Sequence, residues 1–412
     1  MVAIPFFYFS FLSFYIFKKN RECNIAFIST LMYVISAFFS ILIDIYGLRS
    51  DDTRHYQISF LSVFVYCFLL TICIIPFIKK SNTKIDCIKP LKNDTIIKVF
   101  SVLSLIWFFI SISYGWDSIV HAFTIGDYAE ARYKVYQGER EGLIGKIPFP
   151  LNFFILVFNF VFSCPWVLLF CCFYCFAIQK TKWYFSLFYF LASINGPLNS
   201  IVNADRSGST YWILSLIGIY FIFYKYIEEK DKIRIKWLFC ILLFCVIYYI
   251  TSVTIARFEN KDGGASGGFI YYLGCSFINF AYFFDCYELP RVNLGMIFPF
   301  VTQYILGNPT NAVTIQAEMT QLSHINCGTF NTFIGQLIMS CGHYLTILFC
   351  CVYSILSNIA VDKSCKRKDV ASLYLYFAFC SILFLGLFGY YYSSPTKNTS
   401  LFLFYILFKK LN

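Results

Sequence analysis

Long apolar runs separated by short polar segments recur along the whole chain. Most are close to the roughly 20 residues that an α-helix needs to cross a bilayer, and they lack the alternation of a transmembrane β-strand. The pattern predicts an all-α polytopic integral membrane protein with about 10–11 transmembrane helices. The larger number applies if the last, short run crosses the membrane. The expected spans lie at residues 2–17, 25–45, 58–78, 95–115, 151–178, 184–203, 208–225, 237–255, 331–360, 370–391 and 399–409.

Two of these spans carry residues that interrupt a helix. Pro165 lies inside span 151–178, and proline removes a backbone hydrogen bond, so we expect a kink there. Span 184–203 is broken in its outer half. A break at that depth is tolerated only where the backbone faces protein or a watery cavity. The residues that interrupt it are Asn195, Gly196, Pro197 and Asn199.

The composition agrees with a membrane protein. Hydrophobic residues make up 59% of the chain and charged residues 13%, against about 25% charged in soluble domains. Most of the 18 cysteines lie in apolar runs, where the sulfur packs as a small hydrophobic group. Cys275, Cys286 and Cys327 fall in a polar segment, where two of them could form a disulfide.

The charges indicate which loops face the cytoplasm. One alternating set of loops holds 22 Lys and Arg with 8 Asp and Glu, and the other set holds 11 with 14. Because cytoplasmic loops of membrane proteins are enriched in Lys and Arg, the first set is expected inside. The first span has no basic segment before it, so we expect an uncleaved helix with its N-terminus outside. The net charge of +11 is then mostly topology and calls for no nucleic-acid partner.

The external loops favour arginine over lysine. Of the 22 cytoplasmic cations 19 are Lys, whereas seven of the 11 external cations are Arg. A guanidinium binds phosphate or carboxylate through two parallel hydrogen bonds, so the outer face is suited to hold an anion. Local ion pairs with external acids are the alternative. The seven are Arg49, Arg54, Arg132, Arg140, Arg206, Arg257 and Arg291.

We predict a single membrane domain, residues 1–412, with external loops at 116–150 and 256–331. The second of these is the longest part of the chain that does not resemble an ordinary membrane helix. Its two semi-apolar runs are broken by Gly, Pro and acidic residues, so we expect it to be partly helical.

Candidate binding residues lie in and between these loops. Tyr128 and Arg132 are four residues apart and share one face of an expected helix, which suits a sugar or diphosphate or, alternatively, an interfacial anchor. Asp205 and Arg206 stand at a short external turn near the bilayer edge, where ionisable residues are costly; a structural pair between them is the alternative. Arg257 follows span 237–255, so that Arg132, Arg206 and Arg257 could converge on one pyrophosphate. We add Arg140, Arg291 and Glu318 as further substrate-binding candidates.

Histidine is the usual general base near neutral pH. His324 lies just before span 331–360, and Glu318 is close enough in sequence to orient it. His343 would lie about 18 Å inside the same helix at 1.5 Å per residue, where a hydrogen-bonded packing role is expected. No metal-ligand spacing, Walker-type phosphate loop or nucleotide fingerprint is present, so we predict no metal and no cofactor.

The pattern resembles the bacterial O-antigen polymerases, the Wzy-type polymerases of oligosaccharide repeat units. These proteins are similar in their spans, in a large external loop in the C-terminal half and in functional external arginines. The matching segments here are Asp127–Arg132, Arg206–Gly208, Thr254–Phe258 and Asn331–Gly342. In many relatives the last segment carries Asp-Phe-Gly, whereas this chain has Ser340-Cys341-Gly342.

The resemblance implies a multi-pass protein of the bacterial inner membrane with a periplasmic active site. It implies a glycosyltransferase that polymerises undecaprenyl-diphosphate-linked oligosaccharides, with membrane lipid and a chain-length regulator as partners. Arginines, namely Arg206 and Arg257, would stabilise the diphosphate leaving group without a metal, and His324 would be the base. Two alternatives remain: a lipid-linked oligosaccharide flippase and an O-antigen ligase.

Overall fold

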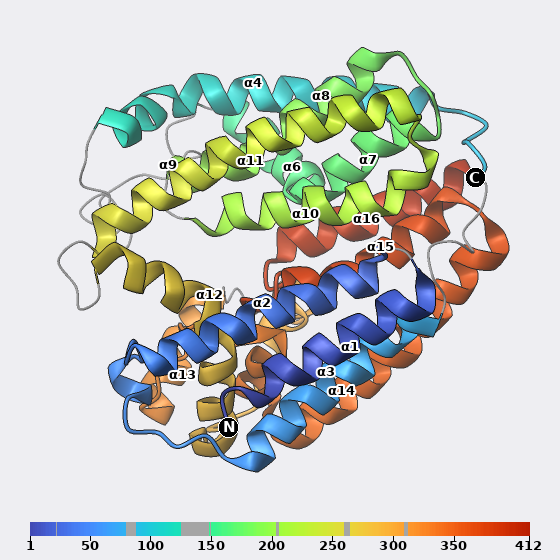
Figure 1. Ribbon diagram of the computed structural model, residues 1–412. Coiled ribbons are helices and arrows are strands. Elements are labelled where there is room, and N and C mark those ends of the chain that lie inside the picture. Colours follow the sequence, from blue (N-terminus) through green and yellow to red (C-terminus); the bar gives the residue numbers. More distant parts are fainter. Residues whose placement is uncertain are drawn as a thin grey trace. The chain divides into compact units, whose positions relative to one another are not determined.

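The computed structural model describes residues 1–21, 23–79, 88–124, 148, 150–202, 206–258, 264–308 and 312–412 (Figure 1). Every regular element within these residues is a helix, which confirms the predicted all-α class. They form two compact units. Unit 1 comprises Met1–Cys87 and Ser266–Asn398, and unit 2 comprises Ile88–Ala265 and Thr399–Asn412.

Eight helices of the described part are long and apolar enough to cross a membrane, or nine if a bent pair counts as one span. Seven expected spans and one unexpected helix make up the eight, and the bent pair is a further expected span. The remaining three expected spans form helices of only 16 or 17 residues. These short helices are α1 (Ile4–Asn20), α15 (Val370–Leu385) and α16 (Pro395–Leu411).

The N-terminal part of unit 1 packs around aromatic side chains. Helices α1, α2 (Ile25–Ile45) and α3 (Phe60–Lys79) lie side by side (Figure 1). The ring of Phe9 on α1 lies 5.6 Å from that of Tyr33 and 5.9 Å from that of Tyr66, centroid to centroid, and all three are buried. Centroid separations of 4.5–7 Å are typical of aromatic pairs that attract. One buried ring therefore ties the three helices together.

Helix α14 (Thr332–Arg367) runs alongside α3 but is broken near its start (Figure 1). Gly342 has φ 76° and ψ 179°, which a residue with a side chain rarely adopts. The carbonyl of Met339 accepts from the Tyr287 hydroxyl at 3.0 Å, and that of Ser340 accepts from the Asn293 amide at 2.8 Å. The segment before α14 therefore supplies the hydrogen bonds that the break removes from the helix.

Unit 2 contains both interruptions predicted from the sequence. Helices α6 (Leu151–Phe162) and α7 (Pro165–Ala177) meet at an angle of 68°, which confirms the kink at Pro165. Helix α8 (Trp183–Ser193) ends before Ile194, and α9 (Asn195–Val202) completes the same span, as the interrupting residues predicted. The other helices of this unit are α4 (Thr95–Thr124), α10 (Ser207–Phe223), α11 (Glu229–Phe258) and the end of α16.

Helix α12 (Gly264–Cys286) departs from the expectation for loop 256–331. Its residues Ser266–Cys286 are long and apolar enough to span a membrane, because the helix absorbs the glycines that made this run look interrupted. Two of its hydrogen bonds lie near the end of α2 and the start of α3. Ser40 donates to the carbonyl of Gly274 at 2.6 Å, and Ser59 donates to Asp285 at 2.9 Å.

These contacts bear on the inclination of α12 within unit 1. Ser40 lies five residues before the end of α2, or about 8 Å at 1.5 Å per residue, and Ser59 directly precedes α3. The stretch of α12 from Gly274 to Asp285 is about 17 Å long. A Cβ on Gly274 would lie 2.4 Å from the backbone of Phe39, so the two helices cross closely at one point. We infer that α12 crosses α2 steeply rather than running parallel to it.

Candidate functional site

Arg206 stands at the start of α10 as its N-cap residue. Its guanidinium is buried, with 9% of the residue exposed, and Nη1 donates to the hydroxyl of Thr254 on α11 at 2.7 Å. A cation at the N-terminus of a helix faces the positive end of the helix dipole, which is unfavourable unless an anion is also present. Backbone N–H groups at a helix N-terminus favour an anion, so the position is compatible with anion binding.

Close packing between α9 and α10 sets the position of Arg206. A Cβ on Gly208 would lie 2.5 Å from the Ser200 hydroxyl oxygen and 2.8 Å from the carbonyl oxygen of Gly196. The amide of Ser209 also donates to Ser200 at 3.2 Å. Only glycine allows this approach, so Gly208 lets the start of α10, which carries Arg206, pack directly against α9.

The same hydrogen bond brings the end of α11 to Arg206. Arg257 follows Thr254 by three residues on α11, about 4.5 Å further along the helix axis. Arg206 at the start of α10 and Arg257 near the end of α11 therefore lie within about one helical turn of the same hydrogen bond. The side chain of Arg257 lies outside the described part of the structure, as do residues Tyr128, Arg132, Arg140 and Asp205.

Three of the other external arginines form local ion pairs, as the alternative predicted. Arg49 lies 2.6 Å from the carboxylate of Asp44, and Arg54 lies 3.9 Å from that of Asp51. Arg291 pairs with Glu318, and its side chain is 56% exposed. For these three the arginine excess needs no ligand to explain it.

His324 and Glu318 are not brought together. His324 is exposed and adopts φ 56°, and no described residue forms a hydrogen bond with its ring. The Glu318 carboxylate instead accepts from Arg291. In the described residues Glu318 pairs with Arg291, and the expected contact between Glu318 and His324 is not formed.

His343 has the hydrogen-bonded packing role that the sequence predicted. Because α14 breaks at Gly342, His343 lies near the end of α12, and its Nε2 is 2.8 Å from the carbonyl oxygen of Phe284. A carbonyl only accepts, so Nε2 carries the hydrogen and Nδ1 is the acceptor in the neutral ring. The sequence did not identify the partner, the carbonyl of Phe284, because hydrophobic periodicity does not reveal the break at Gly342.

An acidic side chain lies close by along the chain. Asp285 accepts from Ser59 and from the hydroxyl of Tyr56, and it follows the residue that binds His343. Burial, and then the hydrogen bond to Asp285, raise the pKa of Tyr56 above its usual range. Tyr56 therefore stays protonated and serves as a donor to the carboxylate.

The thiols and acids of the described residues form no obvious cofactor site. Cys275, Cys286 and Cys327 are free thiols, so the disulfide considered for this segment is not formed. No group of three His, Cys, Asp or Glu side chains in the described part gathers as around a metal ion. Comparison of the chain with protein-family models, with curated proteins and with solved structures gives no match.

Proposed function

We propose that this chain is a membrane glycosyltransferase of the O-antigen polymerase type. Its substrates would be oligosaccharide repeat units linked to undecaprenyl diphosphate, and its site would face the periplasm. The proposal rests on the hydrogen bond between Arg206 and Thr254, which brings the N-terminus of α10 to the turn of α11 that precedes Arg257.

This contact supports a diphosphate site for two physical reasons. A guanidinium at the positive end of a helix dipole gains stability from an anion, and the first turn of α10 adds backbone donors to the same location. A second guanidinium one turn away would share the two charges of a diphosphate. Each arginine can contribute two parallel hydrogen bonds to phosphate oxygens.

The reaction needs stabilisation of a leaving group more than it needs a strong acid. The acceptor hydroxyl attacks the anomeric carbon of the donor sugar, the bond to the diphosphate breaks, and negative charge develops on the departing oxygen. Cations held in position before the reaction lower the energy of that charge. Arg206 and Arg257 would carry this role, while the acceptor proton passes to a base.

The decisive experiment replaces the two arginines in the organism that encodes this chain. We expect Arg206→Ala or Arg257→Ala to abolish long surface polysaccharide, seen as loss of the ladder on a gel, with normal amounts of protein in the membrane. Arg206→Lys keeps the charge but loses the planar fork, and we expect it to restore short chains only. Arg54→Ala is the matched control, because Arg54 is exposed and lies beside Asp51. Normal ladders from both alanine variants would end the proposal.

Deletion of the gene separates the polymerase from the two alternatives. Loss of a polymerase leaves lipid A core capped with a single repeat unit. Loss of a flippase leaves no repeat unit on the core, and loss of a ligase leaves polymer on the lipid carrier. Only the first outcome supports the proposal.

A further inference from the structure

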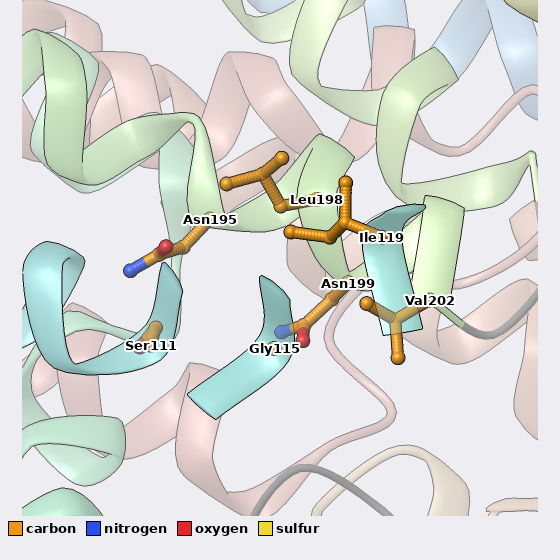
Figure 2. A pocket seen from close by; sticks show the side chains of 7 residues that line it. All are labelled: Ser111, Gly115, Ile119, Asn195, Leu198, Asn199 and Val202. Atoms are coloured by element: carbon orange, nitrogen blue, oxygen red, sulfur yellow. The ribbon is translucent and has the colours of Figure 1, made fainter. Parts of the chain in front are cut away.

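A small cavity with both polar and apolar lining lies between α4 and α9 in unit 2 (Figure 2). It has a volume of about 10 Å³, which is room for about one water molecule. One wall comes from α4 at intervals of four residues, and the other comes from one face of α9. The lining residues are Ser111, Gly115, Ile119, Asn195, Leu198, Asn199 and Val202.

Asn195 is the unusual member of this lining. Only 3% of the residue is exposed, and neither Oδ1 nor Nδ2 has a hydrogen-bond partner among the described residues. A buried amide without partners costs about 1–3 kcal/mol, so native proteins rarely leave one. In Figure 2 the amide extends from α9 towards the part of α4 that carries Ser111.

The unmet hydrogen bonds define the chemistry of the occupant. Oδ1 needs a donor and Nδ2 needs an acceptor, and a single hydroxyl group or water molecule can meet both requirements. A bare cation would meet only the first and would face the amide hydrogens. The cavity is lined by neutral side chains, and its volume excludes a whole sugar ring.

The location connects this cavity to the span interruption. Asn195 is the first residue of α9, where the helix break frees the backbone from regular hydrogen bonding. Val202 lines the far end of the cavity, and Arg206 follows it by four residues. A hydroxyl held here would lie close along the chain to the proposed diphosphate site.

We propose that this cavity is a binding site for one hydroxyl-sized neutral group, held by Asn195 as both donor and acceptor. Two sources supply that chemistry: a resident water molecule, or a hydroxyl of the lipid-linked sugar. The second source rests on the proposed function, whereas the first does not.

The test compares purified wild-type protein with Asn195→Leu, which keeps the branched shape of the side chain and removes both polar atoms. Each is heated alone, with undecaprenyl diphosphate, and with undecaprenyl-diphosphate-linked oligosaccharide. A resident water predicts a midpoint about 2–4 °C lower in the variant, with unchanged stabilisation by either lipid. A sugar hydroxyl predicts that the variant loses only the extra stabilisation given by the oligosaccharide.

Controls keep the result interpretable. Asn159→Leu removes an amide that accepts from Trp107 at 3.1 Å, so it shows the effect of losing a hydrogen bond that is satisfied within the protein. If Asn195→Leu does not fold, Ser111→Ala tests the opposite wall with a smaller change of the same sign. The proposal is overturned if the substituted protein is at least as stable as wild type and both lipids stabilise it equally well. If neither lipid stabilises wild type, the proposed function fails, and the midpoints measured without lipid still test the site.

Discussion

Arg206 and Thr254, 48 positions apart, are joined by a hydrogen bond of 2.7 Å from the guanidinium to the hydroxyl. Thr254→Val keeps the shape of the side chain and removes the acceptor. We expect a loss of about 1.5–3 kcal/mol in the free energy of unfolding, as for hydrogen bonds to charged groups. Equilibrium unfolding in mixed micelles measures it, and Thr254→Ser is the control that should change little. Equal stability of the two variants would show that the contact contributes nothing.

A second prediction concerns the glycine that lets α10 approach α9. Gly208→Ala would place a Cβ 2.8 Å from the carbonyl oxygen of Gly196, and backbone cannot move away as a flexible side chain can. We expect a destabilisation of about 1–3 kcal/mol together with loss of polysaccharide chains, since Arg206 must shift. Gly328→Ala is the matched control, because its nearest neighbour is the side chain of Asn326 at 3.3 Å.

The features that the sequence predicted correctly depend on local chemistry. Pro165 cannot complete a helical hydrogen bond, and the Asn-Gly-Pro sequence starting at Asn195 interrupts a span, so both breaks can be located without knowing the fold. The features that the sequence did not predict, such as the partner of His343, depend on contacts distant in sequence. His343 lies near Phe284 because Gly342 adopts a positive φ, and no periodicity reveals that conformation.

The histidines give a third prediction. His343→Leu leaves the carbonyl of Phe284 without its donor, so we expect a fall of about 1 kcal/mol in stability. His324→Ala removes an exposed side chain that makes no hydrogen bond to a described residue, and we expect a change within about 0.5 kcal/mol. Because the stability of His324→Ala is expected to be unchanged, a loss of chain polymerisation in this variant would report a role of His324 in the reaction itself. An unchanged transfer rate in that variant would remove His324 from the catalytic proposal.

The inclination of α12 leads to a fourth prediction. If α12 crosses α2 steeply and stays near one end of it, both ends of α12 are accessible from the same side of the membrane. We expect native Cys286 and a Ser266→Cys substitution to react with an impermeant maleimide from the same side, in a background where the other accessible cysteines are serine. Labelling from opposite sides would mean that α12 spans the bilayer, as its length and composition allow.

Cys327 provides a prediction that depends on pH. Burial raises the pKa of its thiol above the ordinary value of 9.0, although hydrogen bonds from Ser323 and Thr320 oppose the shift. Less thiolate is present at pH 8, so we expect slower alkylation of Cys327 than of the exposed Cys23, with a rate that still increases above pH 9. The folded state keeps this proton longer than the unfolded state, so the stability it contributes is present below pH 9 and is lost as the pH increases further. Alkylation rates from mass spectrometry at pH 7–10 test this, and equal rates at the two thiols would contradict the burial of Cys327.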